Sequence, residues 1–360
     1  MPATRTALDD AAVLRAGDPG RMLDAIASLG AQLREGFAVA RSTAALPSAE
    51  GVRAVVACGM GGSGVSGDVV RAAFEDRLPV PLVVVKGYAL PAFCDGDTLV
   101  LASSYSGNTE ETLSAYAQAV ARGCRVVAAA SGGDLAALAA ADDVPFVPLP
   151  DTIGMPRAAL GWLAAAPIGV LAAIGLLSEP DEEVESAAAT LDGMADRLAP
   201  DRPAESNEAK SLAMWLGERF PVIWGTQGLG EAAAVRWKAQ FNENAKVPAF
   251  RSVLPELDHN EVEGWHEGSG DRFAVTILRQ PHEPGRTDAR VRATIEVLER
   301  SGLDLREVHA PNGPPLAALF GLIALGDFTS TYAALAKGVD PSPVPVLTAV
   351  KRRLLEEEAT

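Results

Sequence analysis

Short apolar runs alternate with segments long enough to form a helix, and this alternation limits the possible folds more than any other feature of the sequence. Two strands separated by such a segment pair in parallel, because a parallel connection needs a crossover that usually contains a helix. The pattern therefore predicts an α/β protein in which helices flank doubly wound parallel sheets. The expected strands lie at 52–58, 82–85, 98–102 and 125–130 in the first half of the chain, and strands begin again at residue 222 in the second half.

The second half repeats the first. Residues 222–230 match the strand and glycine turn that end at Gly64, and 307–319 echo 125–138. Two copies of one α/β unit are the simplest explanation. We expect these units at residues 46–150 and 206–340, with N-terminal helices at 1–45, a helical connector at 151–205 and a C-terminal helix at 341–360.

A loop rich in hydroxyl groups, SSYSGNTEET, follows the apolar run 98–102 and leads into a helical pattern. Such a turn aims backbone N–H groups and short side chains at one point beside a helix N-terminus, where an anion is favoured. The alternative is an ordinary Ser/Thr helix cap, which needs only one hydroxyl. The loop carries four, and the second copy has none in this place, so we expect one phosphate site per chain. Its expected contacts in this loop are Ser104, Ser106 and Thr109.

The turn at 59–64 matches the G-x-G-x-x-G fingerprint of dinucleotide-binding proteins and directly follows a strand. That fingerprint also needs an acidic residue at the end of the next strand, but this strand ends in the sequence VKGY at 85–88. We therefore expect no dinucleotide cofactor. The glycines still let the backbone approach a sugar phosphate closely, with Gly61 and Ser63 as contacts.

The charge balance excludes several classes of partner. The formal net charge of −16 argues against binding to nucleic acids or to an anionic membrane surface, since both need a basic face. Three cysteines give neither a disulfide framework nor a metal-binding pattern, and His266, His282 and His309 do not combine with carboxylates at metal spacing. We expect a cytoplasmic protein without a metal or another cofactor.

The serine loop, the CGMGGSG turn and the doubled unit together resemble the sugar isomerase (SIS) domain, here in tandem. Over residues 50–355 the chain is further similar to the bifunctional phosphoglucose/phosphomannose isomerases, through GMPR at 154–157, FNENAK at 241–246 and ELDHNE at 256–261. The resemblance implies metal-independent interconversion of glucose 6-phosphate and mannose 6-phosphate with fructose 6-phosphate, through a cis-enediol.

Moving a proton between C1 and C2 of a sugar needs a base, a group that opens the ring and a positive charge for the enediolate. The resemblance implies these roles for Glu243, His259 and Arg157, respectively. Without it, a solvated glutamate at a helix end is the better explanation of Glu243. The alternative for His259 is then a capping or surface role. For Arg157, a surface position at the start of a helix and a catalytic role then have equal weight.

Further contacts are implied by the resemblance alone. A lysine of the C-terminal helix approaches the ring oxygen in this family, and Lys351 is its best match. A small hydroxyl residue makes room for the mannose epimer, and either Ser342 or Thr348 fits. The family forms homodimers in which the histidine reaches the partner's site, so we expect a homodimer with shared active sites. The apolar helix at 158–177 is a candidate interface.

Two other functions remain open at this point. A non-catalytic SIS-type regulator that binds sugar phosphates would carry a DNA-binding or partner domain, for which residues 1–45 are too short and not basic. An enzyme that amidates or deaminates glucosamine phosphates would need an amidotransferase domain or a Schiff-base lysine. The isomerase, acting on hexose 6-phosphates, is the favoured function.

Overall fold

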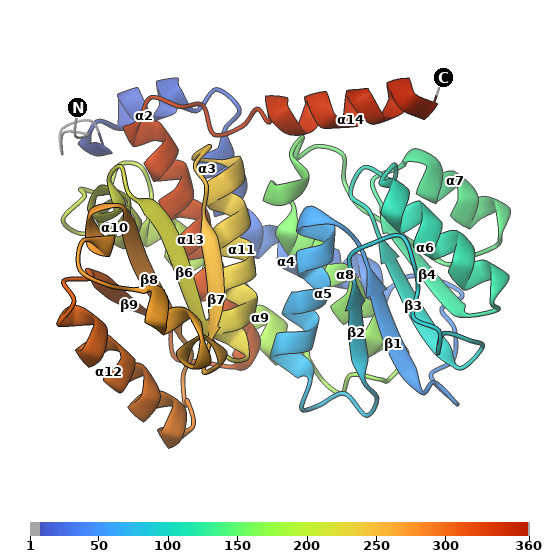
Figure 1. The fold of residues 1–360 in the computed structure, drawn as a ribbon. Helices are drawn as coiled ribbons and strands as arrows, with labels where there is room; N and C mark the ends of the chain where they lie inside the picture. Colours follow the sequence, from blue (N-terminus) through green and yellow to red (C-terminus); the bar gives the residue numbers. More distant parts are fainter. Residues whose placement is uncertain (1–7, 359–360) are drawn as a thin grey trace.

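The computed structural model describes residues 8–358, which form two parallel β-sheets separated by helices (Figure 1). The first sheet has the order β2-β1-β3-β4-β5 and the second has the order β7-β6-β8-β9. The strands of the first are β1 (Ala54–Cys58), β2 (Leu82–Val85), β3 (Thr98–Ser103), β4 (Arg125–Ala130) and β5 (Phe146–Pro148). Those of the second are β6 (Phe220–Thr226), β7 (Phe250–Leu254), β8 (Phe273–Arg279) and β9 (Leu305–His309).

The helices account for most of the remaining chain. Three helices begin the described part: α2 (Ala11–Gly17), α3 (Met22–Ala27) and α4 (Leu29–Arg41). The first unit and connector hold α5 (Gly61–Phe74), α6 (Glu110–Ala121), α7 (Gly133–Ala141), the short η1 (Pro156–Ala158), α8 (Leu160–Ala173) and α9 (Asp181–Arg197). The rest of the chain holds α10 (Glu208–Leu216), α11 (Leu229–Glu243), η2 (Glu256–His259), η3 (Glu261–Gly264), η4 (Ser269–Asp271), α12 (Gly285–Glu299), α13 (Pro315–Ala336) and α14 (Pro345–Glu358).

The predicted α/β fold with two parallel sheets is confirmed. Every strand pair is parallel, and β1 lies between β2 and β3, with Val55 opposite both Leu82 and Leu99. Two local expectations need correction. The strand β5 was not predicted, because its three residues are too few to show a pattern. The glycine turn is also shorter than expected, since residues 61–64 already form the first turn of α5.

Helices cover both faces of each sheet, as a doubly wound arrangement requires. On one face of the first sheet, Tyr116 of α6 and Leu135 of α7 pack against Val100. One face of the second sheet packs against α12 through Val291 and Leu298. The other faces meet a central core that contains residues of α4, α5, α8, α11 and α13. This shared core fixes the two units relative to each other.

The helix α8 does not supply an interface between copies, contrary to expectation. Its residues 160–171 are all buried within the chain, in the central core that also contains α4 and α5. A helix that is apolar on all sides has no face to leave in water, so it fits best in the interior. Its burial in this chain is the physical reason why the expectation was wrong.

The helix α13 is long and apolar enough to cross a membrane by composition, but all of its apolar window is buried inside the protein. It lies behind β6 and α11 in the unit that holds the second sheet (Figure 1), and residues 316–334 are buried. The helix α14 differs, because residues 345–354 are all exposed and the helix lies outside the sheet and helix layers (Figure 1).

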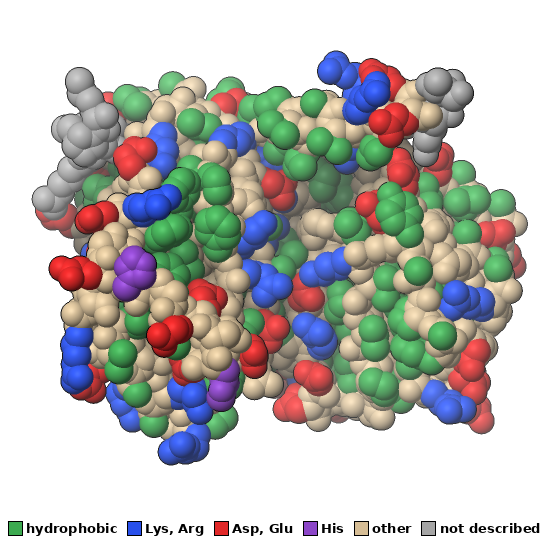
Figure 2. All heavy atoms as spheres, in the orientation of Figure 1, with side chains coloured by type: hydrophobic (Ala, Val, Ile, Leu, Met, Phe, Trp, Pro, Cys, Tyr) green, Lys and Arg blue, Asp and Glu red, His purple; other side chains and the backbone are tan. Residues whose placement is uncertain are grey.

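The surface is hollowed where the two units meet, and charged side chains of both signs gather there (Figure 2). One cavity of about 430 Å³ in this region is lined by Arg71 and Glu75 of α5 and by Gln227 and Glu231 near the start of α11. The start of α11 and the end of α5 therefore lie on the same side of the molecule.

Candidate active site

Two helices begin at neighbouring strand ends without a side-chain cap. The helix α5 follows β1 and its N-cap residue Met60 makes no capping hydrogen bond. The helix α6 follows the adjacent strand β3, and the hydroxyl of its N-cap residue Thr109 does not cap it either. The helix-cap alternative for the serine loop is therefore not realised. Two uncapped helix N-termini at one sheet edge favour an anion between them.

Hydrogen bonds hold the serine loop beside the glycine turn. The hydroxyl of Ser63 accepts the main-chain N–H of Tyr105 at 3.2 Å, and Ser104 donates to Thr109 at 2.9 Å. Gly107 has a φ of +74°, and a Cβ on it would lie 1.8 Å from the carbonyl oxygen of Gly132, so only glycine fits this turn. The loop is thus held in one shape next to α5.

The predicted phosphate contacts differ in their exposure. Ser63 and Ser104 are buried, whereas Ser106 is exposed at the tip of the loop. Apart from its chain neighbours and the backbone of the first turn of α5, no described atom lies within 4 Å of the position that a Cβ would take on Gly61. The space above the first turn of α5 is therefore open to a ligand, with the hydroxyls at its margin.

Arg157 joins this place to the second unit. The loop after β5 brings η1 against α5, where a Cβ on Gly62 would lie 3.1 Å from the carbonyl oxygen of Pro156. The side chain of Arg157 is only 5% exposed, and its Nη1 lies 3.7 Å from the Oε2 of Glu243. Burial lowers the pKa of Arg157, and the carboxylate of Glu243 acts in the opposite direction. Arg157 and Glu243, two of the predicted catalytic residues, are thus brought together.

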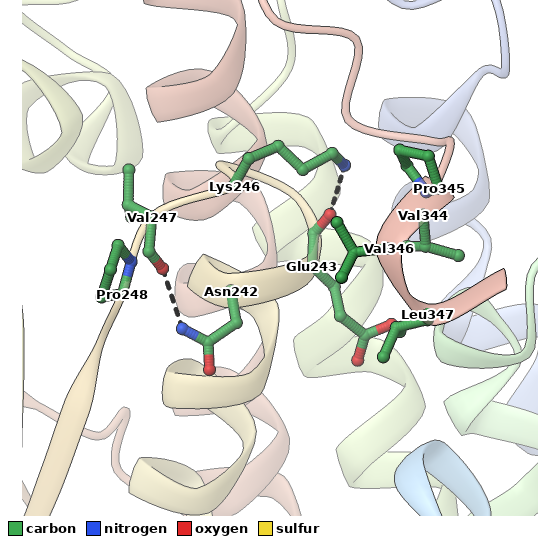
Figure 3. Close-up of a pocket in the computed structure, with 9 residues that line it drawn as sticks. All are labelled: Asn242, Glu243, Lys246, Val247, Pro248, Val344, Pro345, Val346 and Leu347. Carbon is green, nitrogen blue, oxygen red and sulfur yellow. Dashed lines mark hydrogen bonds between the residues drawn. The ribbon is translucent and has the colours of Figure 1, made fainter. Parts of the chain in front are cut away.

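Glu243 is the last residue of α11 and lines a pocket of about 500 Å³. The other walls come from Asn242, from residues 246–248 and from residues 344–347 at the start of α14. Figure 3 shows the carboxylate of Glu243 pointing toward Leu347. The side chain of Glu243 is 27% exposed, so it is partly shielded from water and still accessible to a ligand.

Lys246 also lines this pocket, although the sequence alone predicts no role for it. Its Nζ donates to the main-chain carbonyl of Glu243, as Figure 3 shows, and to that of Pro341 at 3.0 Å. Burial lowers the pKa of Lys246, and the charge of Arg157 lowers it further. The only available signal was its place in the FNENAK motif, three residues after Glu243.

Three predicted residues of the C-terminal region do not line this pocket with their side chains. Lys351 and Thr348 are exposed on α14, beyond the part of that helix that lines the pocket. The hydroxyl of Ser342 is buried against Gly20 and has no hydrogen-bond partner among the described residues, while its carbonyl accepts from Arg157 at 2.7 Å. Ser342 therefore contacts the site through its main chain.

His259 lies at the opposite end of the second sheet from Glu243. It is exposed in η2, which follows the carboxyl end of β7. The helix α11 begins at the carboxyl end of the adjacent β6 and runs back for 15 residues to Glu243, or about 22 Å at 1.5 Å per residue. One chain alone therefore does not bring His259 and Glu243 together.

Comparisons with known proteins identify the family of the chain. Residues 205–354 match the family model described as the bacterial phospho-glucose isomerase C-terminal SIS domain. The chain is 34% identical over 337 residues to a bifunctional phosphoglucose/phosphomannose isomerase of Caldicellulosiruptor bescii, an alignment that covers 93% of this chain and 99% of the relative. It is 33% identical to one of Thermoplasma acidophilum, with coverage of 83% and 89%.

Solved structures share the fold. A hypothetical protein of Thermus thermophilus superposes with a TM-score of 0.77 at 18% identity, over 99% of this chain and 94% of that one. An identity this low supports the architecture alone, whereas the two isomerases align along most of the chain at over 30% identity. The chain therefore belongs to the family of bifunctional phosphoglucose/phosphomannose isomerases.

Proposed function

We propose that this chain is an aldose–ketose isomerase that interconverts glucose 6-phosphate and mannose 6-phosphate with fructose 6-phosphate, without a metal. The observation that carries the proposal is the 3.7 Å approach of Arg157 Nη1 to Glu243 Oε2 at the edge of an open pocket. A carboxylate and a fixed cation at one point are what enediol chemistry needs. The names of the aligned relatives support the choice of sugars.

The phosphate group would bind between the N-termini of α5 and α6. Main-chain N–H groups at Gly61 and the hydroxyls of Ser63, Ser104, Ser106 and Thr109 would hold it. Such a site binds an anion without lysine or arginine, because the helix ends supply partial positive charge. The acidic overall charge of the chain is compatible with this, since the attraction is local.

Glu243 would transfer the proton. Starting from fructose 6-phosphate, its carboxylate takes a proton from C1, and the bonding pair becomes part of a cis-enediolate. The buried guanidinium of Arg157 stabilises the negative charge, which is favourable because a buried site screens charges weakly. Glu243 returns the proton to C2 on one face while the hydroxyl proton of O1 passes to O2, so C1 becomes the aldehyde and C2 carries the hydroxyl of glucose 6-phosphate. Rotation about C2–C3 presents the other face and gives mannose 6-phosphate.

Ring opening is assigned to His259 and Lys351 by the family resemblance. Since His259 lies far from Glu243 in its own chain, we propose that the histidine of a second copy enters the site. This requires a homodimer with shared active sites. We further propose that the enzyme acts in the cytoplasm, where phosphorylated sugars are found.

Replacing Glu243 by Gln tests the assignment. We expect Glu243→Gln to abolish isomerisation, since the amide cannot accept the proton, while binding of a phosphate ligand is retained. Fructose 6-phosphate is added and the appearance of glucose and mannose 6-phosphate is followed by NMR. Glu231→Gln, at the other end of the same helix, serves as the matched control. Near-native turnover by Glu243→Gln would overturn the mechanism.

A further inference from the structure

Asp327 is the one charged residue of the apolar helix α13, and it is completely buried. Burying a carboxylate is costly unless partners satisfy it, and even a satisfied buried pair often adds little stability. A charge at this position therefore calls for a reason other than stability. Its contacts lead to Arg157 by two separate routes.

The first route runs through the carboxylate. Arg236 of α11 donates two hydrogen bonds to the carboxylate of Asp327, from Nε to Oδ1 at 3.0 Å and from Nη2 to Oδ2 at 2.8 Å. The side chains of this pair are only 2% and 1% exposed. The same Nη2 also donates to the main-chain carbonyl oxygen of Arg157. The ion pair thus fixes the backbone of η1 at the catalytic arginine.

The second route runs through the main-chain carbonyl of Asp327. It accepts from the hydroxyls of Ser330 at 3.0 Å and Thr331 at 2.8 Å. The amide nitrogen of Asn244 donates to Ser330 at 3.1 Å, and the Oδ1 of Asn244 accepts from the Nε of Arg157 at 2.9 Å. Asn244 is fully buried, so water does not replace these bonds.

The two terminal nitrogens of the Arg157 guanidinium face different groups. Its Nη2 donates to the carbonyls of Pro341 at 2.8 Å and Ser342 at 2.7 Å. Only Nη1 is left to face Glu243. A guanidinium is planar, so fixing Nε and Nη2 also fixes the direction of Nη1.

We propose that Asn244 and the Asp327–Arg236 pair are positioning residues, which aim Nη1 of Arg157 at the enediolate. This inference rests on the proposed function and assigns side chains that touch no substrate. A guanidinium that is free to tilt would stabilise the enediolate less. The phosphate would bind as before, because the hydrogen bonds that hold the serine loop involve none of these residues.

A double-mutant cycle tests the proposal. The four proteins are the wild type, Asn244→Ala, Arg157→Ala and the double variant, each assayed with fructose 6-phosphate. We expect Asn244→Ala to lower kcat by about tenfold to a hundredfold, the range for a misplaced catalytic group. KM should change little. The double variant should be no slower than Arg157→Ala, because Asn244 acts only through Arg157.

Two further variants separate positioning from general stability. Thr329→Ala removes a buried hydroxyl of the same helix that donates to Leu325 at 2.6 Å and lies outside the cluster. It should lower the melting temperature and leave kcat unchanged. Asp327→Asn keeps the shape of the side chain and should lower kcat without adding to the Arg157→Ala loss, which provides a second cycle if Asn244→Ala does not fold.

The outcomes are distinct. If the losses in kcat are additive in both double-mutant cycles, the positioning role is overturned and the isomerase assignment stays intact. The same follows if Asn244→Ala keeps the wild-type kcat. A wild-type protein without isomerase activity would overturn the proposed function and this inference with it.

Discussion

At the scale of one residue, Glu283 gives a physical reason to expect one phosphate site per chain. Where the first unit has its hydroxyl loop, the carboxylate of Glu283 fills the space after β8. It accepts from the hydroxyl of Thr226 at 2.6 Å, from the main-chain N–H of Gln280 at 3.1 Å and from the Nε of Arg279 at 2.9 Å. A hydroxyl, an amide and a cation are donors that an anion would use. The chain supplies its own anion here.

The free energy of unfolding should depend on pH through the carboxylate of Glu283. Burial alone would raise the pKa of Glu283, but the bonds from Arg279, Thr226 and Gln280 lower it below the ordinary value of 4.5. A lowered folded pKa stabilises the fold above the unfolded value, and this stability is lost as pH falls through the folded pKa. We expect Glu283→Gln to lower the free energy of unfolding at neutral pH by roughly 2 to 4 kcal/mol.

Urea unfolding of the wild type and Glu283→Gln across the acid range measures this effect. The difference between the two proteins should narrow below the ordinary pKa. A difference that stays constant with pH would mean that the folded and unfolded pKa values of Glu283 are equal.

At the scale of the elements, the close contact between α4 and α8 determines where the connector helix α8 packs. A Cβ on Gly161 of α8 would lie 2.6 Å from both the carbonyl oxygen of Leu29 and the Cβ of Gln32. A Cβ on Gly169, two turns later, would lie 2.6 Å from that of Ala40. The glycines let the two backbones approach, and α8 is therefore held in the core rather than at the surface.

Alanine at Gly161 should destabilise the protein. Helix propensity favours alanine over glycine by about 1 kcal/mol, but the clash with backbone atoms of α4 costs about 1 to 3 kcal/mol, so the clash should dominate. Gly193 of α9 is the control, since its added Cβ would meet only the end of Arg197 at 3.4 Å. Gly193→Ala should raise the melting temperature and Gly161→Ala should lower it. A stabilised Gly161→Ala would show that α4 moves away at little cost.

At the scale of the whole molecule, Glu243 and His259 lie at opposite ends of one sheet, so the proposed role of His259 would need a second chain at each site. Arg157 lies 3.7 Å from Glu243 in the same chain, whereas His259 is in η2 at the other end of the second sheet. In a twofold dimer each chain would give its histidine to the partner and receive one in return.

Complementation between two inactive variants tests this arrangement. Glu243→Gln and His259→Ala chains are co-expressed with different tags, and the mixed dimer is isolated. The isolated mixed dimer should have about half of wild-type activity, because one of its two sites is complete. No recovery in an isolated mixed dimer would mean that each chain works alone.

Local sequence patterns predicted most of the strands and the turn that carries the serine loop, because hydrophobic period and turn chemistry act over a few residues. The contacts of Arg157 with Asn244 and Pro341 span 87 and 184 residues, and no local pattern reports them. The resemblance implied separate catalytic roles for Arg157 and Glu243, but not the cluster around Asp327 or the place of Lys246 in the pocket. Lys351 and the hydroxyl of Ser342 do not line the pocket, since Lys351 is exposed further along α14 and the Ser342 hydroxyl is buried against Gly20.

The main-chain carbonyls of Pro341 and Ser342 accept hydrogen bonds from Arg157, and residues 344–347 form one wall of the pocket. A nascent chain with both sheets already folded would thus still lack a finished catalyst until these residues leave the ribosome. A protease that trimmed the chain back past residue 341 would silence the enzyme while sparing nearly all of its core.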